Sequence, residues 1–199
     1  ENILNNIFFM TTTRVLVITG DGKGKTTSAF GMALRALGYG GRVSVVQFVK
    51  HDGAYGEVTA LRQFAGAEVV CAGLGFTPKQ EDSPQWGRHR EAARAGWELA
   101  LSRLEDDSVK MVILDEFFYP IRFGAIALDE AQEAVRRFVA LGETGETGEE
   151  RETRVDRVLV MTGRNAPKEL VALSDTVSRV ECVKHALQEG CKAQEGFEY

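Results

Sequence analysis

The feature that most constrains this fold is a glycine- and lysine-rich loop between a β-rich apolar run and a helical pattern. Residues 15–19 form the apolar run, and residues 19–27 read TGDGKGKTT. Apolar side chains then recur at helical spacing over residues 26–37, and glycines follow within residues 38–41. A strand, a phosphate-cradling loop and a helix in this order indicate a P-loop.

Short apolar runs and helical patterns alternate along the rest of the chain. Further strands are expected at residues 43–49, 68–71, 111–114, 158–162 and 176–183, and helices at 57–64, 86–104, 129–141 and 167–173. Asp129 is the expected N-cap of its helix. Such alternation is typical of parallel βαβ units whose sheet is covered on both faces. We therefore expect an α/β fold, a three-layer P-loop NTPase-like (RecA-like) domain with a mostly parallel central sheet.

Length and composition suit one globular domain. The chain has 199 residues, 44% hydrophobic and 27% charged, which allows a substantial core. We assign residues 14–199 to the domain and residues 1–13 to an N-terminal arm. Residues 142–154 read GETGETGEERETR and contain no apolar side chain, so we expect a flexible acidic insertion there. A docking element is the alternative for this segment.

Charge and cysteine content argue against several function classes. The net charge is −5, which disfavours a nucleic-acid partner because phosphate attraction requires clustered Lys and Arg.

Three scattered cysteines form neither a disulfide framework nor a CxxC zinc motif, so a cytoplasmic location fits best. No apolar run reaches bilayer-spanning length, and residues 1–10 lack the pattern of a signal peptide, so no membrane partner is expected.

The P-loop segment carries the strongest chemical signal, because loop amides and a helix N-terminus together attract phosphate. Lys25 is expected to reach the phosphates, and the Thr26 hydroxyl to contact Mg²⁺. The nucleotide-binding residues predicted in this loop are Gly20, Asp21, Gly22, Lys23, Gly24, Lys25, Thr26 and Thr27. Thr19 occupies the position of the usual first glycine. A strand–helix turn without a ligand is the alternative.

Two other strand ends are expected to meet this loop. Residues 112–116 read VILDE, and an apolar strand that delivers Asp115 and Glu116 is the Walker-B arrangement for Mg²⁺. Another strand ends in Thr-Gly-Arg, which would bring Arg164 near bound phosphate. The carboxyl ends of parallel strands share one sheet edge, where ligands bind. A solvated strand end and a surface arginine are the alternatives.

These motifs indicate ATP or GTP but not the reaction, because Walker features serve ATPases, kinases, GTPases and transferases. The absence of an Asn-Lys-x-Asp motif disfavours a GTP switch. In order along residues 14–199, further segments resemble the ATP:corrinoid adenosyltransferase family. These segments read AFGMALR, GYGGRV, VVQFVK, GFT, LDE, TGR with AP, VKH and KAQEGFEY. The P-loop element alone is generic, whereas VKH and KAQ-x-G are much more specific, since no general P-loop mechanism would predict them.

The resemblance implies transfer of the 5′-deoxyadenosyl group of ATP to the Co(I) centre of a reduced corrinoid, cobalamin or a precursor, with release of triphosphate. It implies that the P-loop holds the triphosphate while the ribose C5′ faces the corrinoid. The implied catalytic residues are Lys25, Thr26 and Glu116, the metal candidates are Thr26, Asp115 and Glu116, and further nucleotide contacts are Arg35, Arg164 and His185. A homodimer and a reducing flavoprotein partner are also expected.

One loop departs from the family. The family commonly reads Gly-Phe-Thr-Trp over the corrinoid, whereas residues 75–78 read GFTP. Phe76 is therefore the predicted corrinoid contact, and Pro78 replaces the Trp. In the family these aromatics help to displace the lower axial ligand, which makes Co(II) easier to reduce. The aromatic residues 117–119 either replace the missing ring or belong to the core.

The sequence leaves two other functions as alternatives to adenosyl transfer. A P-loop kinase or ATPase would bind ATP in the ordinary orientation. A non-catalytic corrinoid- or nucleotide-binding module would have lost turnover. Lys25, Thr26 and Glu116 are all present, which argues against a module that has lost its chemistry.

Overall fold

The chain forms an α/β structure in which strands and helices alternate. The computed structural model describes residues 13–51, 53, 55–75, 83, 85–143 and 156–197. The strands are β1 (Thr13–Thr19), β2 (Arg42–Gln47), β3 (Ala67–Cys71), β4 (Val109–Asp115), β5 (Arg157–Thr162) and β6 (Thr176–Arg179). The helices are α1 (Lys25–Gly38), α2 (Gly56–Leu61), α3 (Gln85–Glu105), α4 (Phe118–Arg122), α5 (Leu128–Glu143), α7 (Lys168–Ala172) and the 3₁₀ helix η2 (Ala186–Glu189).

The strands form one sheet in the order β3-β2-β4-β5-β1-β6. Every pair is parallel, so all six strands end at the same edge. β5 lies between β1, which leads into the P-loop, and β4, which ends in Asp115. Thr162, the last residue of β5, therefore lies between the loops that follow β1 and β4. The expected three-layer, RecA-like fold is confirmed.

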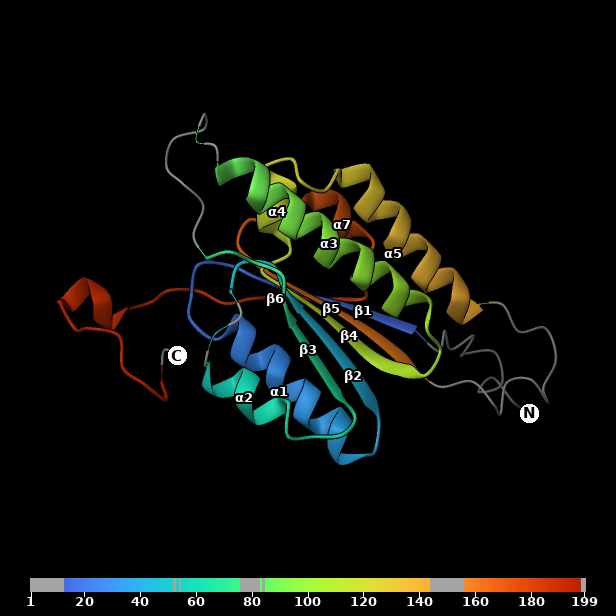
Figure 1. Ribbon diagram of the computed structural model, residues 1–199, viewed down its shortest axis with the longest axis horizontal. Coiled ribbons are helices and arrows are strands. Elements are labelled where there is room, and N and C mark those ends of the chain that lie inside the picture. Colours follow the sequence, from blue (N-terminus) through green and yellow to red (C-terminus); the bar gives the residue numbers. More distant parts are fainter. Residues whose placement is uncertain are drawn as a thin grey trace, which may run out of the picture.

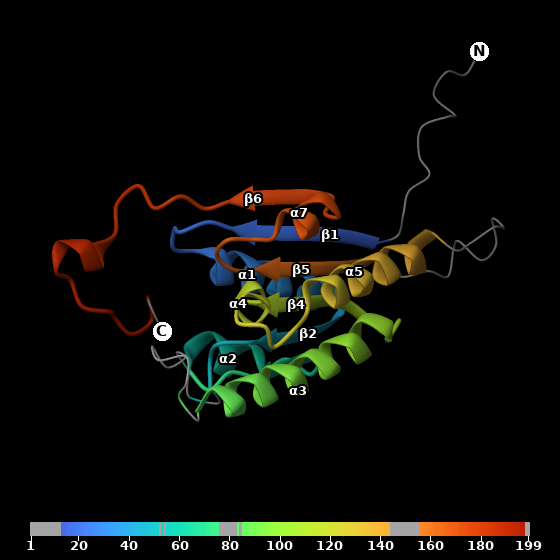
Figure 2. The same ribbon diagram turned by 90° about the horizontal axis from the view of Figure 1, so that it is seen from above.

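Helices cover both faces of the sheet. α1 and α2 lie on one face, and α3, α4, α5 and α7 lie on the other (Figures 1 and 2). Side chains alternate between the faces along each strand, so Val112 and Leu114 pack in the cluster with Trp97 of α3, whereas Met111 and Ile113 pack in the other cluster. Burial on both faces explains why the strands read as continuous apolar runs.

Several boundaries differ from the sequence expectations. β6 ends at Arg179 rather than residue 183, and α4 and η2 were not predicted. Asp129 is not the N-cap, because α5 begins at Leu128 and places Asp129 in its first turn, where a carboxylate favours the helix dipole. Thr13, assigned to the arm, is the first residue of β1 and pairs with Arg157.

The expected acidic insertion begins later than its composition suggested. α5 continues through Gly142 to Glu143. A Cβ atom at Gly142 would lie 2.5 Å from Thr13 Oγ1, so this helix end packs closely on β1. Residues 144–154 of the expected insertion and residues 1–12 of the arm lie outside the described residues.

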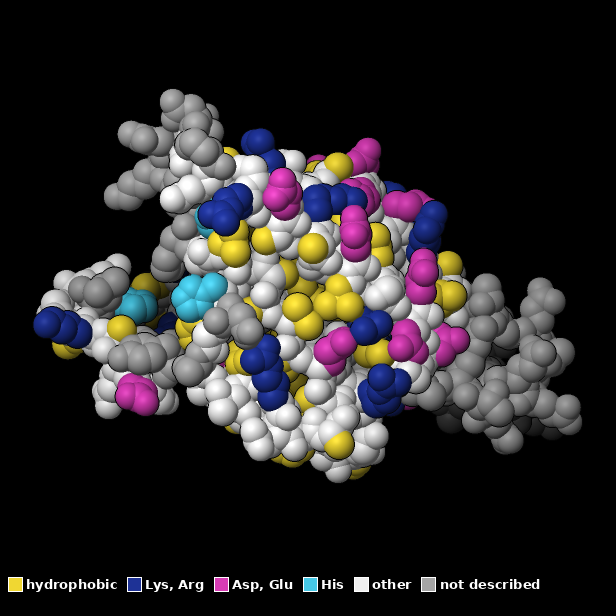
Figure 3. All heavy atoms as spheres, viewed as in Figure 1, with side chains coloured by type: hydrophobic (Ala, Val, Ile, Leu, Met, Phe, Trp, Pro, Cys, Tyr) yellow, Lys and Arg dark blue, Asp and Glu magenta, His cyan; other side chains and the backbone are white. Residues whose placement is uncertain are grey.

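The face that carries α3 shows basic and acidic side chains interspersed rather than gathered by sign (Figure 3). Among the described helices, none is both long and apolar enough to span a bilayer.

Candidate active site

The glycine-rich loop joins β1 to α1 at the carboxyl edge of the sheet. Gly20 and Gly24 have φ angles of 107° and 120°, in the left-handed region that favours glycine. α1 starts directly after Gly24, and its first turn has no acidic residue. The positive end of the helix dipole is therefore not neutralised by the helix itself and suits a bound anion.

Lys25 lies inside this loop and is only 6% exposed. Its Nζ donates a hydrogen bond to the Gly22 carbonyl at 2.9 Å. Burial lowers the pKa of Lys25, and the nearby Glu116 carboxylate opposes that shift. A phosphate bound in the loop would offset the cost of burying this cation.

The segment after β6 holds the loop from outside. The Gly22 N–H donates to the Val180 carbonyl at 2.9 Å. A Cβ atom at Gly20 would lie 2.3 Å from that carbonyl oxygen, and one at Gly22 would lie 2.5 Å from the Glu181 carbonyl oxygen. A side chain at either position would therefore collide with the backbone of the C-terminal segment.

Asp115, the last residue of β4, is 1% exposed, and both of its carboxylate oxygens accept hydrogen bonds. Its Oδ1 accepts from the Thr26 hydroxyl at 2.8 Å and from the Thr162 hydroxyl at 2.7 Å. Its Oδ2 accepts from Gln47 Nε2 at 2.9 Å. Asp115 thus connects the first turn of the P-loop helix to the two strands that flank β4, which are β2 and β5.

Glu116 turns out of the strand toward the loop. Its φ is 55°, unusual for a residue with a side chain, and its N–H donates to Thr162 Oγ1 at 3.1 Å. Burial raises the pKa of Glu116 and the Asp115 charge raises it further, whereas Lys25 and Arg164 oppose the shift. A bound cation would stabilise the charged form of this carboxylate.

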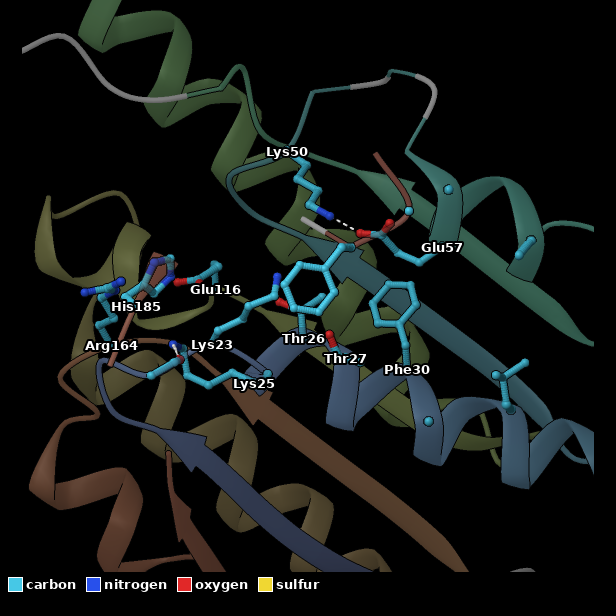
Figure 4. Close-up of a pocket in the computed structure, with 18 of the residues that line it drawn as sticks. Lys23, Lys25, Thr26, Thr27, Phe30, Lys50, Glu57, Glu116, Arg164 and His185 are labelled. Atoms are coloured by element: carbon cyan, nitrogen blue, oxygen red, sulfur yellow. Dashed lines mark hydrogen bonds and ion pairs between the residues drawn. The ribbon is translucent and has the colours of Figure 1, made fainter. Parts of the chain in front are cut away.

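Two cavities meet at these residues. The first, of about 750 Å³, lies at the P-loop and extends along α1 and α2 (Figure 4). The second, of about 620 Å³, is lined by charged side chains and by Tyr55, Phe118 and Tyr119. Residues that line both cavities are Thr26, Lys50, Glu116 and Arg164. A group bound in one cavity would therefore lie next to a group bound in the other.

Two cations at this junction already have acidic partners. Arg164 Nη1 lies 3.1 Å from Asp21 Oδ1, and both side chains are exposed. Lys50 pairs with Glu57 of α2, and its Nζ lies 4.5 Å from the Tyr55 ring centroid (Figure 4). Both pairs involve cavity-lining cations that an anionic ligand could attract.

The donor set fits Mg²⁺ only with help from a ligand. Among the described residues there is no group of three or more His, Cys, Asp or Glu that could hold a metal ion. The site instead offers the Thr26 hydroxyl, the Glu116 carboxylate and the already hydrogen-bonded Asp115. Mg²⁺ is commonly held by one or two carboxylates together with substrate phosphates, so these residues suit a metal that arrives with a nucleotide.

Most of the predicted site residues converge on the first cavity. Those that line it are Asp21, Gly22, Lys23, Gly24, Lys25, Thr26, Thr27, Glu116, Arg164 and His185. Gly20 forms the turn behind them. Arg35 lines neither cavity; it is exposed near the end of α1, about 15 Å along the helix from Lys25. Its nucleotide contact stays a prediction.

The corrinoid residue predicted from the sequence, Phe76, lies outside the described residues. Gly75, directly before it, lines the second cavity. Of the three aromatic residues after the acidic pair, Phe117 is a core residue stacked on Trp97, with ring centroids 5.1 Å apart, whereas Phe118 and Tyr119 line the second cavity.

Sequence reasoning missed several residues of the site. Lys50 lines both cavities, and the only signal for it was its position at the end of the VVQFVK segment. Phe197 lines the first cavity, with its ring centroid 4.8 Å from Lys23 Nζ. Gln47 lies in the same VVQFVK segment, but nothing local in the sequence indicated its contact with Asp115, which is 68 positions away.

Comparisons with known proteins agree on one family. A family model described as ATP:corrinoid adenosyltransferase BtuR/CobO/CobP matches residues 11–199. A corrinoid adenosyltransferase of Escherichia coli K12 is 36% identical over 185 residues, which cover 93% of this chain and 85% of the relative. One from Pseudomonas aeruginosa is 36% identical over 188 residues, with 93% and 83% covered. Corrinoid adenosyltransferase CobA of Salmonella typhimurium is 35% identical over 185 residues, with 93% and 85% covered.

Proposed function

This chain belongs to the ATP:corrinoid adenosyltransferase family, and we propose that its two adjoining cavities bring ATP and a reduced corrinoid together for adenosyl transfer. Its activity is that of a corrinoid adenosyltransferase. The 5′-deoxyadenosyl group passes to the Co(I) centre of cobalamin or a precursor, and triphosphate is released.

The junction of the two cavities is the observation that carries this proposal. The P-loop cavity suits the triphosphate, and the second cavity has aromatic walls that suit the apolar face of a macrocycle. Gly75, the residue before the predicted corrinoid contact, lines the second cavity, which supports this assignment. C5′ would react between them, near Thr26 and Glu116.

The electron balance explains why no general base is assigned. The Co(I) centre of the substrate brings the electron pair, the Co–C5′ bond forms, and the C5′–O bond breaks with its pair leaving on triphosphate. Lys25 and the loop amides stabilise that leaving charge. Thr26 and Glu116 would hold Mg²⁺, which would neutralise phosphate charge there.

The reaction also suggests a partner and a location. Co(I) requires an electron donor, so a reducing flavoprotein and a reducing cytoplasm fit the chemistry. The three cysteines, Cys71, Cys182 and Cys191, form no disulfide with one another, which agrees with such a compartment. We further propose a homodimer, as expected from the family.

One anaerobic assay tests the proposed function. The protein is mixed with ATP, Mg²⁺ and chemically reduced cobalamin, and all products are quantified. We expect adenosylcobalamin and triphosphate in equal amounts. ADP or free phosphate as the main product would instead indicate a kinase or ATPase, and binding without any product would indicate a module that has lost turnover.

A further inference from the structure

A row of hydrogen bonds runs across the carboxyl edge of the sheet. It joins the last residues of four neighbouring strands, which are Cys71, Gln47, Asp115 and Thr162. Cys71 Sγ lies 3.6 Å from Gln47 Oε1, and Gln47 Nε2 donates to Asp115 Oδ2 at 2.9 Å. From the other side, the Thr162 hydroxyl donates to Asp115 Oδ1 at 2.7 Å. Parallel pairing puts these residues side by side in register.

Gln47 lies behind the site rather than in it. Its side chain is fully buried, and it lines neither of the two cavities. Any effect on a bound ligand must therefore pass through its neighbours. The buried carboxylate of Asp115 only accepts hydrogen bonds when ionised, so the amide nitrogen of Gln47 must face it.

The contact with Gln47 fixes how Asp115 meets Thr26. With Oδ2 held by Gln47, the carboxylate cannot rotate without breaking a buried hydrogen bond. Oδ1 is then held toward Thr26, whose hydroxyl proton it accepts at 2.8 Å. A threonine hydroxyl has one proton and two lone pairs. Once the proton points to Asp115, the lone pairs of Thr26 are left for a cation in the cavity.

We propose that Gln47 is a positioning residue for the nucleotide-bound metal. It holds Asp115, Asp115 orients the Thr26 hydroxyl, and the hydroxyl oxygen contacts Mg²⁺. The assignment rests on the proposed ATP and Mg²⁺ site, but it does not depend on the corrinoid reaction. It makes Asp115 an orienting residue behind the metal rather than a principal ligand.

The test measures ATP affinity by calorimetry, with Mg²⁺ and with EDTA, for the intact protein and for Gln47→Met. Methionine is unbranched and similar in size, so it removes the donor while filling the space. We expect ATP affinity with Mg²⁺ to fall by about 10- to 100-fold, as is typical when a partner behind a metal ligand is lost. Affinity in EDTA should stay unchanged.

The matched control is Ser44→Ala on the same strand. Ser44 is 1% exposed, and its hydroxyl donates to the Glu68 carboxylate at 2.8 Å, remote from the loop. Thermal midpoints are recorded for all variants. If Gln47→Met folds poorly, Gln47→Asn is measured instead. Its side chain is one methylene shorter, so its amide cannot reach Asp115 and the hydrogen bond is lost.

A double-mutant cycle with Thr26→Val separates this inference from the proposed site. Thr26→Val should weaken Mg²⁺-dependent binding, and adding Gln47→Met should cost nothing further, since both act on one hydroxyl. Independent, additive losses would overturn the positioning role, as would equal losses with Mg²⁺ and with EDTA. If Thr26→Val itself leaves Mg²⁺-dependent binding intact, the assignment of the metal site fails along with the inference.

Discussion

At the scale of single residues, the site holds charges that burial disfavours until ligands arrive. Burial lowers the pKa of Lys25 and raises that of Glu116, so each charged form carries a solvation cost. The two groups partly offset each other. A phosphate near Lys25 and a cation near Glu116 would stabilise these buried charges. The site should therefore bind ligands that carry such charges.

Lys25→Ala should reduce kcat by about 10²–10³, because a fixed cation beside the leaving triphosphate acts in the transition state. The measurement is adenosylation of chemically reduced cob(I)alamin under saturating ATP. Lys110→Ala, a substitution near the amino end of β4, is the control and should leave kcat unchanged. A kcat close to normal in Lys25→Ala would refute its catalytic role.

Phe76→Ala should impair the reaction from Co(II) with a weak biological reductant far more than the reaction from Co(I). A ring against the macrocycle excludes water and the axial base, and the Co(I) route bypasses that step. The measurements are both rates and the Co(II) electron paramagnetic resonance spectrum with ATP. Pro78→Trp is the companion variant and should leave the Co(I) rate similar. Equal losses on both routes, with an unchanged four-coordinate signal, would make Phe76 a packing residue only.

At the scale of elements, the P-loop is formed from two distant parts of the chain. The Val180 N–H donates to the Thr19 carbonyl at 2.8 Å, and its carbonyl accepts from Gly22. The backbone just beyond β6 therefore extends the edge of the sheet and closes one side of the loop. Farther along, His185, Gly196 and Phe197 line the P-loop cavity, so the VKH and KAQ-x-G segments both reach this cavity.

Gly20→Ala should lower the free energy of unfolding by about 1–3 kcal/mol, the usual cost of a strained backbone position. Its φ of 107° is unfavourable for alanine, and the new Cβ would lie 2.3 Å from the Val180 oxygen. The measurement is urea unfolding, together with ATP binding, which should weaken. The control is Gly87→Ala in α3, where nothing lies within 4 Å of the new Cβ. Stability equal to the wild type in Gly20→Ala would show that this contact is not maintained in solution.

At the scale of the whole molecule, the candidate site lies at the carboxyl ends of the strands, whereas the described residues that flank the expected insertion lie at the amino ends. These flanking residues are Glu143, where α5 ends, and Arg157, where β5 begins. All the predicted site residues that line the cavities lie at or beyond the carboxyl ends. The function of the site should therefore not depend on the expected insertion.

Deleting residues 144–154 and bridging the gap with a short turn should leave the thermal midpoint and activity nearly unchanged, because the segment has no apolar anchor. A longer deletion that starts at residue 142 is the control and should lower the midpoint, since it removes the close contact between Gly142 and Thr13. A large loss from the shorter deletion would show that these residues pack or participate.

The sequence by itself determined most of the elements and the position of the P-loop between a strand and a helix. Apolar runs buried on both faces, helical spacing and the glycines before Lys25 are local patterns, and they predicted the parallel sheet, the P-loop and its phosphate-binding residues. The order of the strands leaves no such local pattern. The tertiary structure alone placed β5 between β1 and β4, brought Gln47 to Asp115 across 68 positions, and set Val180 against Gly20. These contacts depend on which strands become neighbours, and that is decided by packing of the whole chain.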